Sequence, residues 1–233
     1  MIGLAFNRTW QQLLHPKFRS VFFTAVLTAF ATLSALIYLL KIYWPTDLSY
    51  GYSWLEWLDE AGFWATVAVG SYVLFPAVVT MVMGFLTDKI ALAVEEEYYP
   101  HRMGMRKVPA IEVVLGSVKL MLLMILVNLI ALIPYILLLV TAGTGTFLLF
   151  VAVNGFLLGR EYFEMVAIRH MDARDVTRMR KRNSGKIFTV GALIAGLFAI
   201  PFLNILAPII GTAVMTHIFQ HLSGDRVRGG EGV

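Results

Sequence analysis

Four long segments of the chain contain no Asp, Glu, Lys or Arg. They run from Ser20 to Leu40, Ala61 to Thr87, Leu120 to Gly159 and Ile187 to Leu222. About 20 apolar helical residues span a hydrocarbon core about 30 Å thick, so each segment is long enough to enter a bilayer. A helix with one face in water carries polar side chains every turn or two, and these segments lack that pattern. The pattern predicts an all-α integral membrane protein.

Basic residues between these segments predict the orientation in the membrane. Residues 88–119 contain five Lys or Arg residues and residues 160–186 contain eight, whereas residues 41–60 contain Lys41 against four acids. We therefore expect residues 41–60 to form an outside loop, with its Trp and Tyr side chains at the membrane interface. Both termini are then cytoplasmic.

This orientation requires the last two apolar segments to enter and leave the bilayer on the same side. We expect full spans at about 20–44 and 61–87, and helical hairpins at about 120–159 and 187–221. The second hairpin turns between Pro201 and Pro208, because proline breaks a helix interior. Its legs of about 14 residues are about 21 Å long, which predicts a re-entrant hairpin covered by protein. For the first hairpin, full and partial penetration both remain open.

The segments outside the bilayer also have helical patterns. We expect an interfacial helix over residues 1–15, with Leu4 and Trp10 on its apolar face. The second span continues to Tyr99 and ends before Pro100, and another helical extension covers residues 159–182. Residues 1–222 are expected to form one helical membrane domain, followed by a disordered tail over residues 223–233.

Composition excludes several other classes. Hydrophobic residues make up 58% of the chain and charged residues 15%, against about 25% in soluble domains. The absence of cysteine excludes disulfides and thiolate metal sites. The net charge of +4 is explained by membrane orientation, so we expect no nucleic-acid partner.

Signatures of enzymes and of metal or nucleotide sites are absent from the sequence. It contains no HExxH, no GxSxG and no phosphate-binding glycine loop. The histidines are scattered, and we expect them at the membrane interface rather than as ligands: His15, His101, His170, His217 and His221. We therefore predict that the protein is not an enzyme and holds no cofactor or metal.

Polar residues at the membrane edge are the candidates for function. One group is Lys17, Phe18, Arg19 and Ser20 at the start of the first span, where cations and free helix amides suit an oxyanion. Simple positive-inside anchoring is the alternative for its two cations. Other polar positions of the interior are Asp88, Lys89, Glu95, Asn154, Arg160 and Glu161.

Several short motifs resemble those of the CysZ family of bacterial sulfate permeases. They are Pro16-Lys-Phe-Arg19, Gly84-Phe-Leu-Thr-Asp-Lys89, Gly159-Arg-Glu-Tyr-Phe-Glu164 and Ile200-Pro-Phe-Leu-Asn-Ile-Leu-Ala-Pro208 followed by Gly211-Thr212. The resemblance covers about residues 5–222. It implies two spanning helices and two hairpins, assembled as a homo-oligomer.

The resemblance also implies a function and a site. It implies ATP-independent uptake of sulfate across the bacterial inner membrane, supplying cysteine biosynthesis. Arg19 is then the main sulfate-binding residue, although Lys17 stands where the family has glycine. A non-transport scaffold or lipid-interacting protein, using the basic residues of 160–186, is the alternative. Channel-like and proton-coupled transport, the oligomer number, and selectivity among sulfate, sulfite and thiosulfate remain open.

The orientation can be tested by cysteine labelling in intact cells. Asp47→Cys is expected to react with a membrane-impermeant maleimide from outside, because residues 41–60 form the acidic loop. Arg178→Cys, in the basic segment, is expected to react only after the membrane is permeabilised. The opposite pattern of labelling would overturn the orientation.

Overall fold

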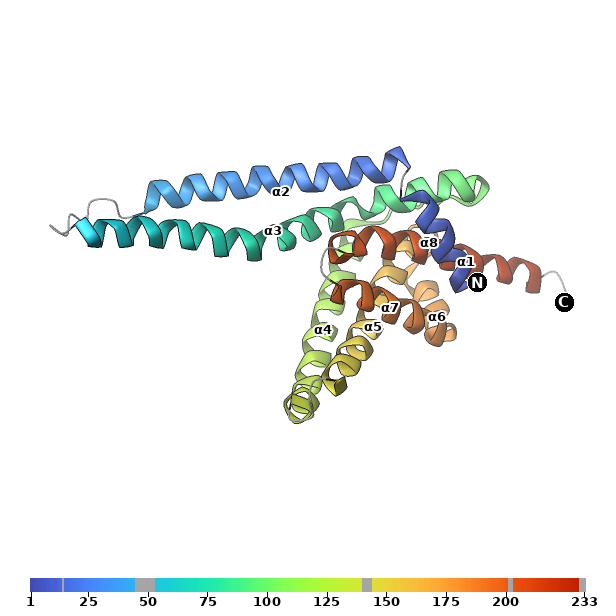
Figure 1. Ribbon diagram of the computed structural model, residues 1–233. Helices are drawn as coiled ribbons and strands as arrows, with labels where there is room; N and C mark the ends of the chain where they lie inside the picture. The colour runs from blue at the N-terminus through green and yellow to red at the C-terminus, as the bar shows by residue number, and fades with distance from the viewer. Residues whose placement is uncertain (14, 45–52, 140–143, 201–202, 231–233) are drawn as a thin grey trace. The chain divides into compact units, whose positions relative to one another are not determined.

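The computed structural model describes residues 1–13, 15–44, 53–139, 144–200 and 203–230. Every regular element in these residues is helical, and no strand occurs among them. The elements are α1 (Ile2–Gln12), α2 (Pro16–Tyr43), α3 (Ser53–Tyr98), η1 (Pro100–Arg102), α4 (Ala110–Leu139), α5 (Thr144–Ala167), α6 (Ala173–Arg182), α7 (Ser184–Ala199) and α8 (Leu203–Gly230). They form two compact units, one of Met1–Phe18 with Thr87–Val233 and the other of Arg19–Leu86 (Figure 1).

Apolar helices of membrane-spanning length confirm the fold class. Four described stretches are long and apolar enough to cross a bilayer: Pro16–Tyr43, Ala110–Leu138, Gly145–Ala167 and Leu203–Gly224. The continuation of the second span is also confirmed, because α3 runs to Tyr98 and the chain then turns into η1 at Pro100. The division of the chain into a single domain stays a prediction.

In the unit Arg19–Leu86, α2 lies beside the first part of α3 as an antiparallel pair (Figure 1). The ring centroids of Phe30 and Phe75 lie 5.0 Å apart, and those of Trp44 and Phe63 lie 5.3 Å apart. Trp44 also donates its indole N–H to Asp59 over 3.2 Å. Residues 45–52 of the expected outside loop lie outside the described residues, so that loop stays a prediction.

In the other unit, α4 and α5 form the first hairpin (Figure 1). Its expected tip at residues 141–146 lies partly outside the described residues, and α5 begins at Thr144. Helix α4 starts at Ala110, ten residues before the expected leg, and only 6% of its most apolar window is buried by the chain. The apolar surface of α4 is therefore available to lipid or to another subunit.

The closest helix crossing in this unit joins α5 to α7 through three glycines. A Cβ atom added to Gly191 would lie 2.0 Å from the carbonyl oxygen of Gly155 and 2.5 Å from the amide nitrogen of Gly159. Gly155 and Gly159 are four residues apart, so they lie on one face of α5. Small residues at this spacing let two helix backbones touch, as in many membrane proteins. Gly191 therefore packs within the chain.

Helix α8 is the buried element of the fold, packed by α1, α5 and α7. Leu203–Gly224 is the part of α8 that is long and apolar enough to span a membrane, and 83% of its most apolar 18 residues are buried. Thr212 and Thr216 satisfy their buried hydroxyls by donating to carbonyl oxygens four residues earlier, over 2.8 Å each. Covering by protein is what the predicted re-entrant hairpin requires, although its depth in the bilayer stays a prediction.

The boundaries of the second hairpin differ from those predicted. Helix α7, with 16 residues, is as short as expected, but α8 begins at Leu203 and includes Pro208. Pro208 is the sixth residue of α8, where it removes the hydrogen bond to the carbonyl of Asn204 and its ring crowds that carbonyl, so it weakens the start of the helix without ending it. The bounds of α8 extend past Ser223 to Gly230, and the disordered tail over residues 223–233 stays a prediction.

Helix α1 packs on the rest of its unit with its small and polar residues. Ala5, Thr9 and Gln12 are buried, whereas Leu4 and Trp10 are each 65% exposed. The small and polar residues thus face α8, and the large apolar ones point away from the chain. An interfacial position of α1 would place Leu4 and Trp10 in lipid, as predicted.

The glycine crossing can be tested with two alanine substitutions in α7. Gly191→Ala is expected to lower the free energy of unfolding by about 1–3 kcal/mol, because a methyl group would collide with the backbone of α5. At Gly196 an added Cβ meets no atom within 4 Å, so Gly196→Ala is expected to be neutral or to stabilise by about 0.5 kcal/mol. Thermal denaturation in detergent measures both. Equal stability of the two variants would exclude a close crossing at Gly191.

Candidate functional site

The start of α2 shows where the predicted sulfate-binding residues lie. Helix α2 begins at Pro16, so Lys17, Phe18 and Arg19 occupy its first turn. Phe18 is buried, whereas Arg19 and Ser20 are exposed. Lys17, 54% exposed, forms an ion pair with Glu96. The charge of Lys17 is therefore shared with a carboxylate. Lys17 and Phe18 belong to one unit and Arg19 and Ser20 to the other.

Glu95 is the most deeply buried charged group of the predicted set. Its side chain has no exposed surface, and its carboxylate accepts hydrogen bonds from Arg169 over 3.1 Å, His170 over 2.9 Å and the amide of Gly104 over 3.1 Å. Burial raises the pKa of the Glu95 carboxyl, but these partners outweigh it and hold the pKa below its ordinary value. Glu95 is therefore a buried anion that joins α3 to two loops.

Two arginines meet one carboxylate in the cluster around Arg160. Arg160 donates to Glu164 over 2.9 Å rather than to its neighbour Glu161, and Arg180 of α6 reaches the same oxygen of Glu164 over 3.0 Å. The reason is helical geometry, since residues four apart share a face and adjacent residues do not. Glu161 forms no ion pair among the described residues.

The remaining predicted polar residues do not converge on this cluster. Asn154 donates to the carbonyl oxygen of Phe150 over 2.9 Å, one turn earlier in its own helix. Asp88 and Lys89 are both exposed. Within the described part of the chain, no group of three or more His, Asp or Glu residues is placed to hold a metal ion.

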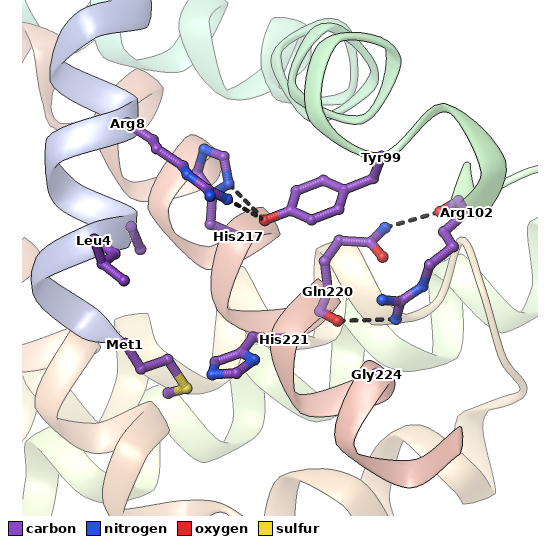
Figure 2. A pocket seen from close by; sticks show the side chains of 10 residues that line it. Met1, Leu4, Arg8, Tyr99, Arg102, His217, Gln220, His221 and Gly224 are labelled. Carbon is purple, nitrogen blue, oxygen red and sulfur yellow. Dashed lines mark hydrogen bonds between the residues drawn. The ribbon is translucent and has the colours of Figure 1, made fainter. Parts of the chain in front are cut away.

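A basic pocket lies between α1, the end of α3, η1 and α8. We call it the α1–α8 pocket, and Figure 2 shows its lining. Its cavity volume is about 550 Å³, within the range of small-molecule sites. The lining residues are Met1, Leu4, Ala5, Arg8, Tyr99, Arg102, His217, Gln220, His221 and Gly224. Two guanidinium groups line it, and none of these lining residues is acidic.

Hydrogen bonds fix the polar side of this pocket. Arg102 donates to the carbonyl oxygen of Gln220 over 2.8 Å, and the Gln220 amide donates back to the carbonyl oxygen of Arg102 over 2.9 Å. The Tyr99 hydroxyl lies 2.9 Å from Nδ1 of His217 and 3.5 Å from a guanidinium nitrogen of Arg8 (Figure 2). Arg8 also lies over the ring of Tyr98, 5.3 Å from its centroid. Arg102 is thus held by two short hydrogen bonds, and Arg8 is oriented by two longer contacts.

Burial raises the pKa of the Tyr99 phenol against the opposing charges of Arg8 and Arg102. The hydroxyl therefore keeps its proton at neutral pH. It remains a hydrogen-bond donor as well as an acceptor.

No pattern in the sequence indicates this pocket. His217, expected at the membrane interface, is 3% exposed and enclosed by protein, and its depth in the membrane stays a prediction. Arg8, Tyr99 and His217 are 91 and 118 positions apart along the chain, and no short motif joins them. The one signal in the sequence is that His217 and Gln220 are polar residues inside an apolar segment, which membrane proteins rarely tolerate without a role.

These features together define a multi-pass helical membrane protein with basic sites at the ends of its helices. A model of the family described as Sulfate transporter CysZ/Etoposide-induced protein 2.4 matches residues 5–208. The chain belongs to this family, and the resemblance noted in its motifs is confirmed. No curated protein and no solved structure matches the chain. The family description names a sulfate transporter and no enzyme.

The role of Glu95 can be tested through stability and its pH dependence. Glu95→Gln is expected to lower the free energy of unfolding by about 3–5 kcal/mol, because it leaves the partly buried Arg169 without its counter-charge. Because folding lowers the pKa of Glu95, its contribution is present above the ordinary value of 4.5 and is lost as the pH falls below it. The variant should therefore lose less stability in acid than the wild type.

Glu96→Gln is the matched control at the next position. Its partner Lys17 is 54% exposed and Glu96 is 39% exposed, so the loss should be about 0–1 kcal/mol. Urea or thermal unfolding in detergent at several pH values measures both variants. A Glu95→Gln variant as stable as Glu96→Gln would contradict the assignment of a buried anion.

Proposed function

We propose that the protein transports sulfate across the bacterial inner membrane without ATP, supplying sulfur for cysteine biosynthesis. The observation that carries this proposal is the family match over residues 5–208, in a chain with four helices of spanning length. The family description also contains a protein named only for its induction by etoposide, so the match alone supports a sulfate-transporter-like membrane protein. Sulfate as the substrate is the further step proposed here.

Arg19 is the proposed sulfate ligand, assisted by Lys17 and by backbone amides from Phe18 to Ser20. The exposure of Arg19 in the first turn of α2 supports this assignment, because both its guanidinium and the helix N-terminus can reach an anion. Lys17 has a smaller role because Glu96 already neutralises part of its charge. Asp88, Lys89, Glu95, Asn154, Arg160 and Glu161 are proposed as polar positions near the path, with Glu95 as a structural anion.

A homo-oligomer is proposed as the working assembly. The apolar surface of α4 supports it, since 6% of its most apolar window is covered by the chain itself. Both termini are proposed to be cytoplasmic, as the basic segments predict.

A lipid-interacting protein without transport activity is the second proposal. The specific observation in its favour is the exposed basic surface of α6, formed by Arg174, Arg178, Lys181 and Arg182. Each basic residue near an anionic membrane contributes about 1 kcal/mol of attraction. This surface would bind membranes whether or not the chain transports sulfate.

Sulfate flux into proteoliposomes tests the first proposal. The purified chain alone should admit radiolabelled sulfate, and Arg19→Ala should weaken sulfate binding about tenfold to a hundredfold by removing a charge-assisted hydrogen bond. The sulfate affinity of Arg19→Lys should lie between those of the wild type and Arg19→Ala, because lysine keeps the charge and loses the planar guanidinium.

Arg178→Ala is the charge-matched control. Arg178 is 72% exposed and pairs with Asp175 on the same helix. Flux and binding of this variant should equal those of the wild type. Equal losses from Arg19→Ala and Arg178→Ala would show that Arg19 is only an orientation anchor. Absence of any flux by the wild type, with membrane binding that depends on α6, would favour the second proposal.

A further inference from the structure

We propose that the α1–α8 pocket binds a tetrahedral oxyanion, and that it is a second anion site sharing no residue with the one assigned to Arg19. The ligand class is sulfate or phosphate, either as the free ion or as the phosphate group of an anionic lipid. All residues of the pocket belong to the unit Met1–Phe18 with Thr87–Val233. The inference therefore does not rest on the transport proposal or on Arg19.

The charge of the lining residues favours an anion. Arg8 and Arg102 both line the pocket, and the described lining contains no carboxylate to balance them. Three acids near the end of α3 are already engaged, since Glu95 binds Arg169 and His170, Glu96 binds Lys17, and Glu97 accepts from Gln12. Two cations at a cavity with no acid among its described lining residues attract an anion, and guanidinium groups favour oxyanions with several oxygens.

Contacts within the protein orient both arginines of the pocket. Arg102 uses one terminal nitrogen to bind the carbonyl oxygen of Gln220 and the hydroxyl of Ser223. Arg8 is oriented by the hydroxyl of Tyr99 and by the ring of Tyr98. Each guanidinium has five N–H donors, so several on each remain for a ligand after these contacts. Cations that are already oriented lose less conformational entropy when they bind.

The pair of Tyr99 and His217 supplies the third argument. His217 is 3% exposed, and its Nε2 atom is buried without a hydrogen-bond partner. A proton on Nε2 would be a buried donor without an acceptor, which is rarer and more costly than an unused lone pair. With the proton on Nδ1 instead, His217 donates to Tyr99, and the hydroxyl proton of Tyr99 is available to a ligand. The pocket then offers a neutral donor between two cations.

Size and lining allow both sources of the oxyanion. A volume of about 550 Å³ leaves room for water around a free ion or for an organic group attached to it. Leu4 and Ala5 of α1 form an apolar wall, against which such a group would pack. Leu4 itself is 65% exposed, so this wall continues to the surface that α1 would turn to lipid. Free sulfate and a lipid phosphate share the chemistry that the two arginines recognise.

Equilibrium dialysis of the detergent-solubilised full chain with radiolabelled sulfate, and separately with radiolabelled phosphate, tests the pocket. The wild type is expected to bind at two sites. Arg8→Gln and Arg102→Gln should each weaken one of them by about tenfold to a hundredfold. Tyr99→Phe, which keeps the ring and its packing, should weaken the same site about twofold to tenfold. Lys107→Gln, at an exposed position outside the lining, should change nothing.

Arg19→Gln separates this inference from the proposed function. Loss of one site in Arg19→Gln and of the other in Arg102→Gln supports both assignments. Loss only in Arg102→Gln supports the pocket and contradicts Arg19. Sulfate and phosphate binding that falls only in Arg19→Gln, and stays at the wild-type level in Arg8→Gln, Arg102→Gln and Tyr99→Phe, shows that the pocket binds no free oxyanion. The pocket assignment is then overturned unless these pocket variants lose lipid, which is measured separately. If an arginine variant does not fold, Tyr99→Phe decides.

Native mass spectrometry identifies the source of the oxyanion. The wild type should retain phosphatidylglycerol in preference to phosphatidylcholine if a lipid phosphate occupies the pocket, and Arg8→Gln and Tyr99→Phe should lose that preference. Unchanged lipid retention with weakened sulfate or phosphate binding assigns the pocket to the free ion. Unchanged binding of sulfate, phosphate and lipid in all pocket variants would show that no oxyanion binds there.

Discussion

One buried carboxylate organises the polar end of this protein. Glu95 has no exposed surface, and removing a charge from water is so unfavourable that it persists only with compensating partners. Those partners come from the loop after η1, through Gly104, and from the turn after α5, through Arg169 and His170. The end of α3 is thereby held against the α5 turn. Tyr98, Tyr99 and Arg102 follow within seven residues, so the position of the basic pocket depends on the same carboxylate.

Close backbone contact and coverage of α8 stabilise the rest of this unit. In lipid, apolar side chains gain little by meeting one another, so helices associate through packing and hydrogen bonds. The glycines of α5 and α7 provide that packing, and α8 is enclosed by its neighbours so that its polar side chains avoid hydrocarbon. Hydroxyls on α2 and α3 are satisfied within their own helices, such as Thr28 by Thr24 and Thr66 by Gly62. These threonines therefore do not mark a polar path.

The sequence was sufficient for the fold class because the bilayer imposes one rule on every span. Charge-free length identified α2, α4, α5, α7 and α8, and Pro100 correctly ended α3. Features that depend on tertiary packing could not be predicted from the sequence. Pro208 was taken as the limit of the hairpin turn, although α8 continues through it with one hydrogen bond lost and one carbonyl crowded. The burial of His217 against Tyr99, 118 positions earlier, cannot be inferred from local pattern.

The sequence indicated which polar residues matter but not which partners they meet. Glu95 was singled out as a polar residue near a span, but its partners Arg169 and His170 lie 74 and 75 positions later. Arg160 and Glu161 were singled out as adjacent polar residues, but the partner of Arg160 is Glu164, one helical turn away. Local spacing thus identifies which residues need a partner, and the fold determines which partner they meet.

Helix α4 also sets a length scale. Its charge-free part from Leu120 to Leu139 is about 30 Å long at 1.5 Å per residue, equal to the thickness of an average hydrocarbon core. Lys119 marks the lower boundary of this part, and Glu112, paired with Arg106 over 2.5 Å, fixes the start of the helix to the protein. Such a helix matches one membrane thickness best, and each ångström of mismatch costs a fraction of a kcal/mol through tilting or bilayer deformation. Lipid chain length is therefore a variable that acts on this hairpin directly.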